Sequence, residues 1–401
     1  MKNISTKVVI IGGGVAGSAL ACCLADLGIE SVVIERRREP ADLNRGDGQQ
    51  PRSQEILEKI GVLNEFRKAG AIESYGNEIY HPSLGQLLEV DLGIIKTTPF
   101  PWILNLPHPN IEKILHEHAQ KSGKCTFIYG NASEAVLEGK IISQVNVKCQ
   151  GGEELSISAP VVIAADGMAS RFRKKLDIAA EFTAYNHQLL CFHAKKPSWI
   201  SGRARTRVYM HRKGAVVFLP LPNDIVRITA LIDSKEAGDW SGISVAELKT
   251  RLSERLPQFK DLEIDEHGMH FYKLQKMHAA KYSEGNLALV GDAAHVTHPA
   301  GGQGMNMGIQ DADELARQLL AYFNGEQNLE KSFDAYERVR RPINQNVIGR
   351  AQFMSWLLWS PKWSSYLGRT LYAGLLRILP PVYNKVTSSI AWGIAGLTPP
   401  Q

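Results

Sequence analysis

The chain has 401 residues, of which 44% are hydrophobic and 22% are charged, and its net charge is +5. This balance is typical of a folded globular protein and excludes a disordered or collagen-like chain. The positive charge is small and spread along the chain, apart from the run 36–38, which argues against a nucleic-acid partner. Because the length exceeds what one ordinary core supports, we expect at least two domains.

The cysteines are five in number and include no CxxC pair. They predict free thiols in a reducing cytoplasm rather than disulfides. No group of His, Cys and Asp has the spacing of a metal site, and no apolar run of about 18 residues predicts a membrane-spanning helix. Residues 1–25 resemble a secretory signal in charge and apolarity, but the glycines at 12–14 and 17 favour a strand, a turn and a helix instead.

A nucleotide-binding unit is predicted at the N-terminus. Residues 7–11 form a β-branched run that is typical of a buried parallel strand. Residues 12–17 fit GxGxxG, whose glycines allow a tight turn, close approach of a pyrophosphate and close helix packing. A helix over 16–27 and a strand over 31–34 follow, and the acid at the strand end is placed to bind an adenosine ribose. The candidate cofactor-binding residues are Gly12, Gly14, Val15, Ala16, Gly17, Glu35 and Arg36.

Two further strands are predicted to end on a carboxylate. Residues 160–165 are an apolar run followed by Asp166, and residues 286–290 are an apolar run followed by Gly291 and Asp292. A glycine-dense loop and an amphipathic helix follow the second run. A strand-end carboxylate can hold a sugar or ribityl hydroxyl, a loop without side chains accepts a flat ring, and a helix N-terminus attracts an electron-rich edge. These parts suit a flavin.

The three motifs, spanning roughly residues 7–350, resemble the group A flavoprotein monooxygenases of the p-hydroxybenzoate hydroxylase type. The resemblance implies an α/β fold, in which a Rossmann-like FAD-binding domain is interleaved with an antiparallel-sheet substrate domain, here with a C-terminal helical tail. It implies that the first motif binds the ADP half of FAD. Asp166 would then lie near the FAD pyrophosphate and NAD(P)H, and Asp292 would hold the ribityl chain.

The same resemblance assigns the glycine-dense loop to the flavin ring. Pro299 would lie against the ring, and Gly301, Gly302 and Gly304 would form the wall beside a flavin C4a-hydroperoxide. The N–H groups of Met305 and Asn306 would face the N1–C2=O edge of the ring, where a helix N-terminus stabilises negative charge. The implied reaction is hydroxylation or epoxidation of an aromatic or heteroaromatic small molecule, with O2 as oxidant and NAD(P)H as reductant.

One position departs from the family pattern. The family helix matched by residues 111–119 usually opens with an arginine near the flavin, whereas this chain has His108 there. Histidine still donates a hydrogen bond, but its charge depends on pH. The chain also resembles bacterial alkylquinolone monooxygenases in this region, some of which lack the arginine. A quinolone-like substrate is therefore one hypothesis, and reduction by NAD(P)H or by externally supplied reduced flavin stays open.

The domain division follows from a change in the hydrophobic pattern along the chain. We assign 1–74, 106–183 and 283–350 to the FAD-binding domain, 75–105 and 184–282 to the substrate domain, and 351–401 to the tail. Alternating runs in the substrate segments predict antiparallel strands. The candidate substrate contacts are Tyr209, His211, Phe218, Leu219 and Pro220. Ordinary core packing is an equal alternative for all of them except His211. The candidate catalytic residues are His295, Pro299 and Gly302.

His211, His270 and His295 could each deprotonate a phenol-like substrate, although a surface or core histidine is the commoner outcome. The tail carries an apolar i, i+4 stripe from Trp359 to Leu379. It predicts either a functional role, as a peripheral membrane contact or a lid over a lipophilic substrate channel, or a helix that packs on the core or a dimer partner. We favour the packing helix. The sequence does not fix the oligomeric state.

Two alternatives share the nucleotide-binding motifs. One is a flavin-dependent reductase of isoprenoid double bonds, and the other is a non-catalytic lipid escort protein of the GDI type. The acids Glu35, Asp166 and Asp292 argue against the escort protein, because a protein without FAD does not need all three. A halogenase is disfavoured because the Trp-x-Trp-x-Ile motif is missing.

Overall fold

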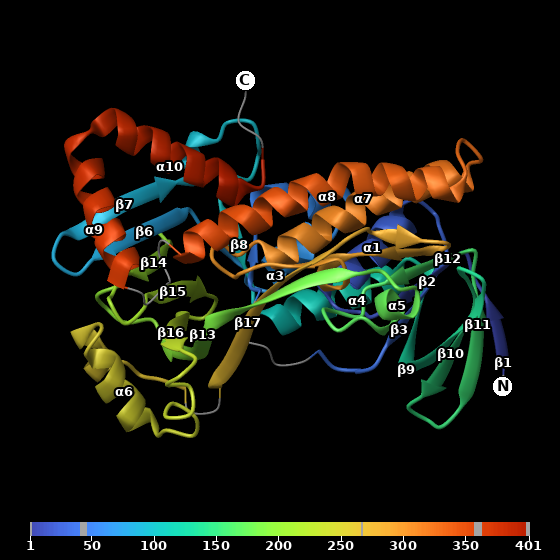
Figure 1. Ribbon diagram of the computed structural model, residues 1–401, viewed down its shortest axis with the longest axis horizontal. Coiled ribbons are helices and arrows are strands. Elements are labelled where there is room, and N and C mark those ends of the chain that lie inside the picture. The colour runs from blue at the N-terminus through green and yellow to red at the C-terminus, as the bar shows by residue number, and fades with distance from the viewer. Residues whose placement is uncertain (1, 41–45, 266–267, 357–362, 398–401) are drawn as a thin grey trace.

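The structure is a computed structural model that describes residues 2–40, 46–265, 268–356 and 363–397. Figure 1 shows an elongated molecule with one large sheet at each end and two long helices, α7 (Gly304–Phe323) and α8 (Leu329–Met354), running between the ends. The mixed α/β architecture confirms the predicted fold class.

The first sheet has nine strands in the order β1-β11-β10-β9-β3-β2-β12-β19-β18. Its strands are β1 (Lys2–Ser5), β2 (Val8–Ile11), β3 (Ser31–Glu35), β9 (Cys125–Glu138), β10 (Ile141–Cys149), β11 (Glu154–Ser158), β12 (Val161–Ala164), β18 (Ser283–Glu284) and β19 (Leu287–Leu289). The five strands from β9 to β19 in this order run parallel. Strands β2, β12 and β19 are buried along their whole length, as expected of parallel strands covered on both faces.

The three strands predicted to precede binding motifs are therefore confirmed, and they are neighbours. Since β2, β12 and β19 are parallel and adjacent, their carboxyl ends meet at one edge of the sheet. This edge brings together three segments that lie far apart in sequence.

Helices cover this sheet and set the spacing of the motifs. They are α1 (Val15–Asp26), α2 (Pro51–Lys59), α3 (Leu63–Lys68), α4 (His108–Lys121) and α5 (Arg171–Lys175), besides α7 and α8. Helix α1 packs on both α4 and α7. A Cβ on Gly308 of α7 would lie 2.9 Å from the Cβ of Ala16, so the two helices approach through small residues.

The second sheet has eight strands in the order β20-β17-β13-β16-β15-β14-β6-β7. Its strands are β6 (Gly76–His81), β7 (Gly85–Asp91), β13 (Ala180–Lys195), β14 (Thr206–Tyr209), β15 (Val216–Leu221), β16 (Ile225–Asp233), β17 (His270–Ala279) and β20 (His295–Val296). One face packs beneath α6 (Val245–Ser253) through a cluster that includes Phe192 and Phe218. The opposite face packs with Ala300 of the glycine-dense loop through residues such as Leu189 and Val217; we call it the loop-facing side.

A three-stranded sheet joins the two ends, in the order β4 (Gly48–Gln49), β8 (Ile103–Asn105), β5 (Ile72–Ser74). Most strands of the second sheet lie within the predicted substrate segments, but β8 does not join it. Strand β20 belongs to residues 295–303, which include the glycine-dense loop assigned above to the flavin ring and which we call the flavin loop. The domain boundaries stay a prediction.

The described part of the tail forms two helices, α9 (Trp363–Ile378) and α10 (Pro380–Ala395). Leu376 of α9 is buried with the loop-facing side, and Ala391 of α10 is buried against β7. The side-chain amide of Gln303 donates to the carbonyl of Gly393 (2.9 Å), which ties α10 to the start of α7. Trp359 lies outside the described residues. Among the residues that the structure describes, no helix is long and apolar enough to cross a membrane.

Candidate functional site

The glycine-rich turn after β2 is shaped by close backbone contacts. Gly12 has φ +102°, and a Cβ there would lie 2.3 Å from the carbonyl oxygen of Ala165. A Cβ on Gly17 would lie 2.0 Å from the carbonyl oxygen of Gly12. Only glycine satisfies both positions, so the first and last glycines of the motif are explained by packing of the turn.

Side chains hold the middle of this turn. The N–H of Gly13 donates to the carboxylate of Glu35 (2.7 Å), while Ser18 Oγ donates to the carbonyl of Gly13 (2.7 Å). His116 Nε2 lies 2.5 Å from the same carbonyl oxygen. Sequence reasoning missed His116, whose only signal was a histidine on the buried face of a helix. The predicted Arg36 is exposed beside this site.

Asp166 follows β12 and retains an unused acceptor. Its Oδ2 accepts the N–H of Arg171 (2.9 Å), whereas its buried Oδ1 has no hydrogen-bond partner among the described residues. Burial raises the pKa of this carboxyl. A buried acceptor without a partner is destabilising unless a donor fills the site, and a sugar hydroxyl supplies such a donor. This observation fits a dinucleotide at the sheet edge.

Arg173, which lies on α5 seven residues after Asp166, is fully buried. Its guanidinium donates to the carbonyls of Ala293 (2.8 Å) and Met168 (2.9 Å). It therefore ties the end of β12 to the turn after β19 and acts on a ligand only through these two segments.

The turn after β19 exposes Asp292, and the loop that follows exposes Pro299, Gly301 and Gly302. Gly301 and Gly302 have φ of +94° and +64°, and the N–H of Gly302 donates to the carbonyl of Pro299 (2.9 Å). The exposed turn and loop leave backbone and carboxylate accessible on the side where Asp166 also lies. This arrangement fits the ribityl chain and ring of a flavin.

Helix α7 begins at Gly304, so the N–H groups of Gly304, Met305 and Asn306 have no acceptor within the helix. The side chain of Asn306 accepts from the N–H of Gln50 (2.9 Å) and donates to the carbonyls of Gly48 and Gly302 (both 2.9 Å). Asn306 thus fixes the helix start against β4. The free N–H groups can face an anionic edge of a ring.

His108 lies at the start of α4, beside the start of α7. A Cβ on Gly46 would lie 3.1 Å from His108 Nδ1 and 3.7 Å from Met305 Sδ, so both residues flank Gly46. The N–H of His108 donates to Asp47 Oδ1 (3.2 Å), and its Nε2 lies 3.5 Å from a carboxylate oxygen of Glu112. The predicted position of His108 next to the flavin loop therefore has a geometric basis.

Arg227 provides a permanent positive charge at the same place. It projects from β16, and its Nη1 lies 2.5 Å from Asp47 Oδ2, while Asp47 is almost fully buried. Register places Arg227 opposite Leu219, so both belong to the loop-facing side. Sequence reasoning missed Arg227 and Asp47. The signal that the sequence offered for Arg227 was a charged residue within an otherwise apolar run.

His295, predicted as a base, is buried in a network under the loop. Its Nε2 lies 2.5 Å from Asp311 Oδ2, and Arg340 Nε donates to Asp311 Oδ1 (2.8 Å). Asn344 also donates to Asp311 (3.0 Å). Although burial alone would raise it, His295 and Arg340 lower the pKa of Asp311 to about 2. The carboxylate is therefore charged, and the network anchors α7 to α8 and to the flavin loop.

A second buried histidine pair joins the flavin loop to the second sheet. His298 Nε2 lies 2.9 Å from Nε2 of His187 on β13, and the N–H of Ala300 donates to His298 Nδ1 (3.0 Å). The ring of Tyr185 packs edge-on against His298, and its buried hydroxyl has no hydrogen-bond partner among the described residues. Burial lowers the pKa of His187 to about 4 and that of His298 to about 3. Sequence reasoning missed all three residues of this cluster.

The predicted substrate contacts divide between the two faces of the second sheet. Tyr209 stacks on Tyr80, and Phe218 packs against Phe259, both in the cluster beneath α6 and away from Ala300. Leu219 belongs to the loop-facing side. The structure therefore does not bring Tyr209 and Phe218 to the flavin loop, because alternation along a strand gives two faces without saying which one meets a ligand.

The remaining candidates lie at strand ends. Pro220 is buried and its carbonyl accepts from Asn105 (2.9 Å). His211 follows β14, and burial together with Arg255 lowers its pKa to about 4. His270 begins β17. Among the residues that the structure describes, no group of three or more His, Cys, Asp or Glu side chains could hold a metal ion.

Comparisons with known proteins place the chain. A family model described as FAD binding domain matches residues 5–351. The chain is 28% identical to an uncharacterized aromatic compound monooxygenase, YhjG, of Bacillus subtilis, over 88% of this chain and 68% of that protein. The solved p-nitrophenol 4-monooxygenase PnpA of Pseudomonas putida has a TM-score of 0.82 at 21% identity and covers 100% of both chains. PqsL of P. aeruginosa in complex with 2-aminobenzoylacetate has a TM-score of 0.80 at 24% identity, over 92% of this chain and 100% of that one.

The family match spans most of the chain and includes all three motifs of the sheet edge. Neither the isoprenoid reductase nor the lipid escort protein is favoured by these relatives. The chain therefore belongs to the FAD binding domain family and is a flavoprotein monooxygenase of the group A type.

Proposed function

We propose that this monooxygenase hydroxylates a small aromatic or heteroaromatic substrate held between the flavin loop and the loop-facing side of the second sheet. One observation carries the proposal: Ala300 of the flavin loop packs directly on this face, whereas the other face is filled beneath α6. The names of the relatives, which include an aromatic compound monooxygenase and a para-nitrophenol 4-monooxygenase, support an aromatic substrate. A quinolone-like ring is one member of this class.

FAD supplies the redox chemistry and activates O2 when it is bound. In the proposed assignment, Glu35 and the N-terminal glycines hold its ADP half, and Asp166 and Asp292 hold its sugar hydroxyls. The N–H groups at the start of α7 face the ring. The family match supports FAD, and the unused Oδ1 of Asp166 supports this placement.

NAD(P)H is the proposed reductant. The guanidinium of Arg227, which Asp47 holds beside His108, would take the place of the family arginine. A guanidinium stays charged at every physiological pH, unlike an imidazole. This arrangement supports normal reduction in spite of the substitution at position 108.

The hydrogen bonds of the histidine pair determine which of its ring nitrogens carry a hydrogen. Because a backbone N–H can only donate, Nδ1 of His298 accepts and its Nε2 bears the hydrogen. That hydrogen is donated to Nε2 of His187, which leaves the hydrogen of His187 on Nδ1. A neutral His187 is then a hydrogen-bond donor toward an oxygen acceptor such as a carbonyl or a phenolate.

The experiment is purification followed by turnover with a panel of phenols, anilines and quinolones. We expect a yellow protein, consumption of NAD(P)H that rises when a substrate is added, and a product that incorporates one oxygen atom from O2. A protein that cannot be reconstituted with FAD contradicts the assignment. Activity with supplied reduced flavin, but none with NAD(P)H, contradicts the reductant alone.

A further inference from the structure

The outer face of α9 carries a continuous apolar stripe. Four residues spaced four apart lie on it, Trp363, Leu367, Leu371 and Leu375, and Leu379 continues the spacing directly after the helix ends. Their exposed fractions range from 41% to 69%. Spacing by four places them along one side of the helix. A stripe of this kind is larger than the scattered apolar residues that soluble surfaces normally show.

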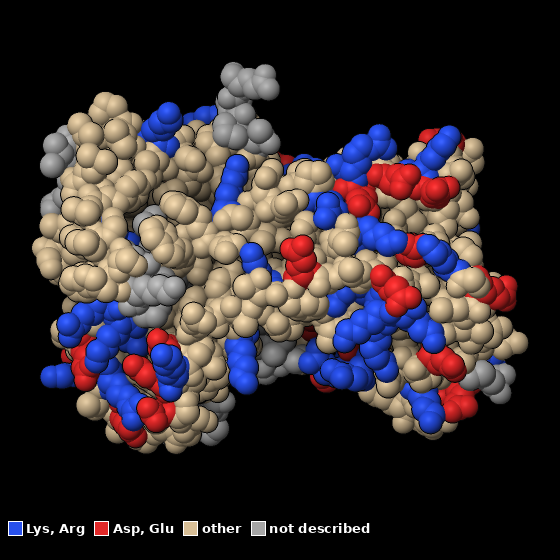
Figure 2. All heavy atoms as spheres, viewed as in Figure 1, with Lys and Arg blue, Asp and Glu red and all other residues tan. Residues whose placement is uncertain are grey.

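The charge of this region is one-sided. Residues 338–401 contain no Asp or Glu. They contain eight basic residues: Arg338, Arg340, Arg341, Arg350, Lys362, Arg369, Arg377 and Lys385. Arg340 and Arg369 are buried, whereas Arg338, Arg350 and Lys385 are exposed and face the solvent. Figure 2 shows that the area over α9 and α10 is mostly uncharged, with few basic side chains and no acidic one. The rest of the visible face mixes both signs.

We propose that α9 and the adjoining part of α10 form a docking surface for an anionic phospholipid bilayer. An amphipathic helix that combines an apolar face with basic residues binds in the plane of such an interface, and each basic residue near an anionic surface adds attraction. A second copy of the chain fits less well, since two surfaces that lack acids would repel each other. The absence of a spanning helix among the described residues is consistent with a helix that lies on the bilayer.

The inner side of the same helices connects this surface to the candidate active site. Leu376 packs into the loop-facing side together with Ala300, and Gln303 binds the carbonyl of Gly393 (2.9 Å). The tail therefore separates the bilayer from the substrate face by the thickness of one helix layer. A lipophilic aromatic substrate dissolved in the bilayer would enter at this boundary.

The test is co-sedimentation of the holoenzyme with vesicles, without substrate or NAD(P)H, so that its outcome does not depend on the proposed reaction. The vesicles are phosphatidylcholine alone or phosphatidylcholine mixed with phosphatidylglycerol. We expect binding to the anionic vesicles only, weakened by raised salt. Equal binding to both vesicles, or binding to neither, overturns the proposal.

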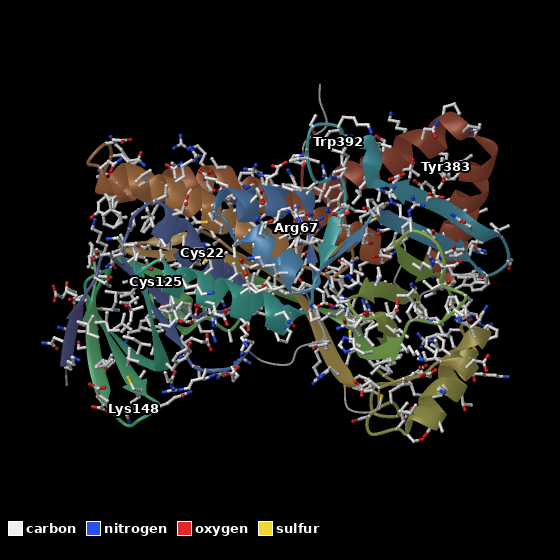
Figure 3. All side chains as sticks on the ribbon, turned by 180° about the vertical axis from the view of Figure 1, so that it is seen from behind. Cys22, Arg67, Cys125, Lys148, Tyr383 and Trp392 are labelled. Carbon is white, nitrogen blue, oxygen red and sulfur yellow. The ribbon has the colours of Figure 1, made fainter. Side chains whose placement is uncertain are left out.

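Matched variants locate the surface. The double variant Leu371→Gln/Leu375→Gln should bind at least about tenfold more weakly, and Lys385→Gln about fivefold more weakly. The controls are Ile141→Gln, an exposed apolar residue of β10, and Lys148→Gln. Figure 3 shows Lys148 at the opposite end of the molecule from Tyr383 and Trp392 of α10. The substituted leucines are exposed, so circular dichroism should be unchanged.

A concentration-dependent dimer that these leucine substitutions abolish, without vesicle binding, would assign the stripe to a second copy.

Discussion

The Nε2 atoms of His187 and His298 lie 2.9 Å apart, and both imidazoles are buried. This contact joins a strand of the second sheet to the flavin loop. Burial lowers the pKa of His187 to about 4, which Asp233 offsets in part, and lowers that of His298 to about 3. Each group is therefore neutral in the folded protein and charged in the unfolded chain between about pH 4 and 6.5.

The first prediction concerns stability and pH. Because the folded pKa values are lowered, the pair's contribution is complete above about pH 6.5 and is lost as pH falls toward 4. The free energy of unfolding, measured with urea at pH 7 and pH 5, should fall less in His298→Asn than in the native chain. His118→Asn, on the half-exposed side of α4, is the control. An identical pH dependence in all three proteins would show that the pair does not stay neutral.

The second prediction concerns the buried carboxylate of Asp311. Replacing it with alanine leaves the guanidinium of Arg340 buried without its ion pair, so we expect a loss of about 3–5 kcal/mol in the free energy of unfolding. Asp313→Ala, on the same helix, removes only ion pairs with the exposed Lys59 and the partly exposed Arg52 and should lose less than about 1 kcal/mol. Chemical denaturation of the two variants measures the difference, and equal losses would contradict the role given to the network.

The third prediction separates two kinds of glycine. Gly12→Ala places a Cβ 2.3 Å from a backbone oxygen, whereas a Cβ at Gly28 meets nothing within 4 Å, although both have positive φ. We expect Gly12→Ala to lose bound FAD, and Gly28→Ala to retain it with a loss of about 1 kcal/mol in stability. The absorbance of bound flavin after gel filtration gives the answer. Retention of FAD by Gly12→Ala would contradict the packing argument.

The fourth prediction tests the charge beside His108. Arg227→Met leaves Asp47 buried without its ion pair. We expect slower flavin reduction by NAD(P)H and, because Arg227 is partly exposed, a stability loss of about 1–3 kcal/mol. The double variant Arg227→Met/Asp47→Asn should recover part of the stability but not the reduction rate. Stopped-flow reduction that is unchanged in both variants would remove Arg227 from the proposed site.

The sheet edge could be predicted because its strands are short apolar runs, and each run ends in a glycine or aspartate motif that suits few kinds of ligand. Strands β13 and β17 were not predicted, since most of their residues are exposed or only partly buried. The hairpin of β9 and β10 was missed for the same reason. Long-range pairs such as Asp47 with Arg227 lie 180 residues apart and have no local signal. Which face of the second sheet meets the flavin loop depends on packing that alternation cannot specify.

The state of the cysteines could also be predicted from the sequence. All five are free thiols, as predicted. Figure 3 shows Cys22 and Cys125 close together beside the first sheet. Burial raises the pKa of the Cys125 thiol to about 11. The four buried cysteines, Cys22, Cys23, Cys125 and Cys191, act as small apolar residues in the core.

The hydrogen bond from Gln303 to the carbonyl of Gly393 has a consequence for protein engineering. Gln303 immediately precedes α7, whose first N–H groups are assigned to the flavin. The bond therefore couples the position of α10 to the position of these N–H groups. A chimera that exchanges the tail for that of a relative changes the support of the flavin loop as well as the outer surface. Exchanges that keep residues 299–306 together with their own α10 should preserve cofactor affinity, and those that split them should not.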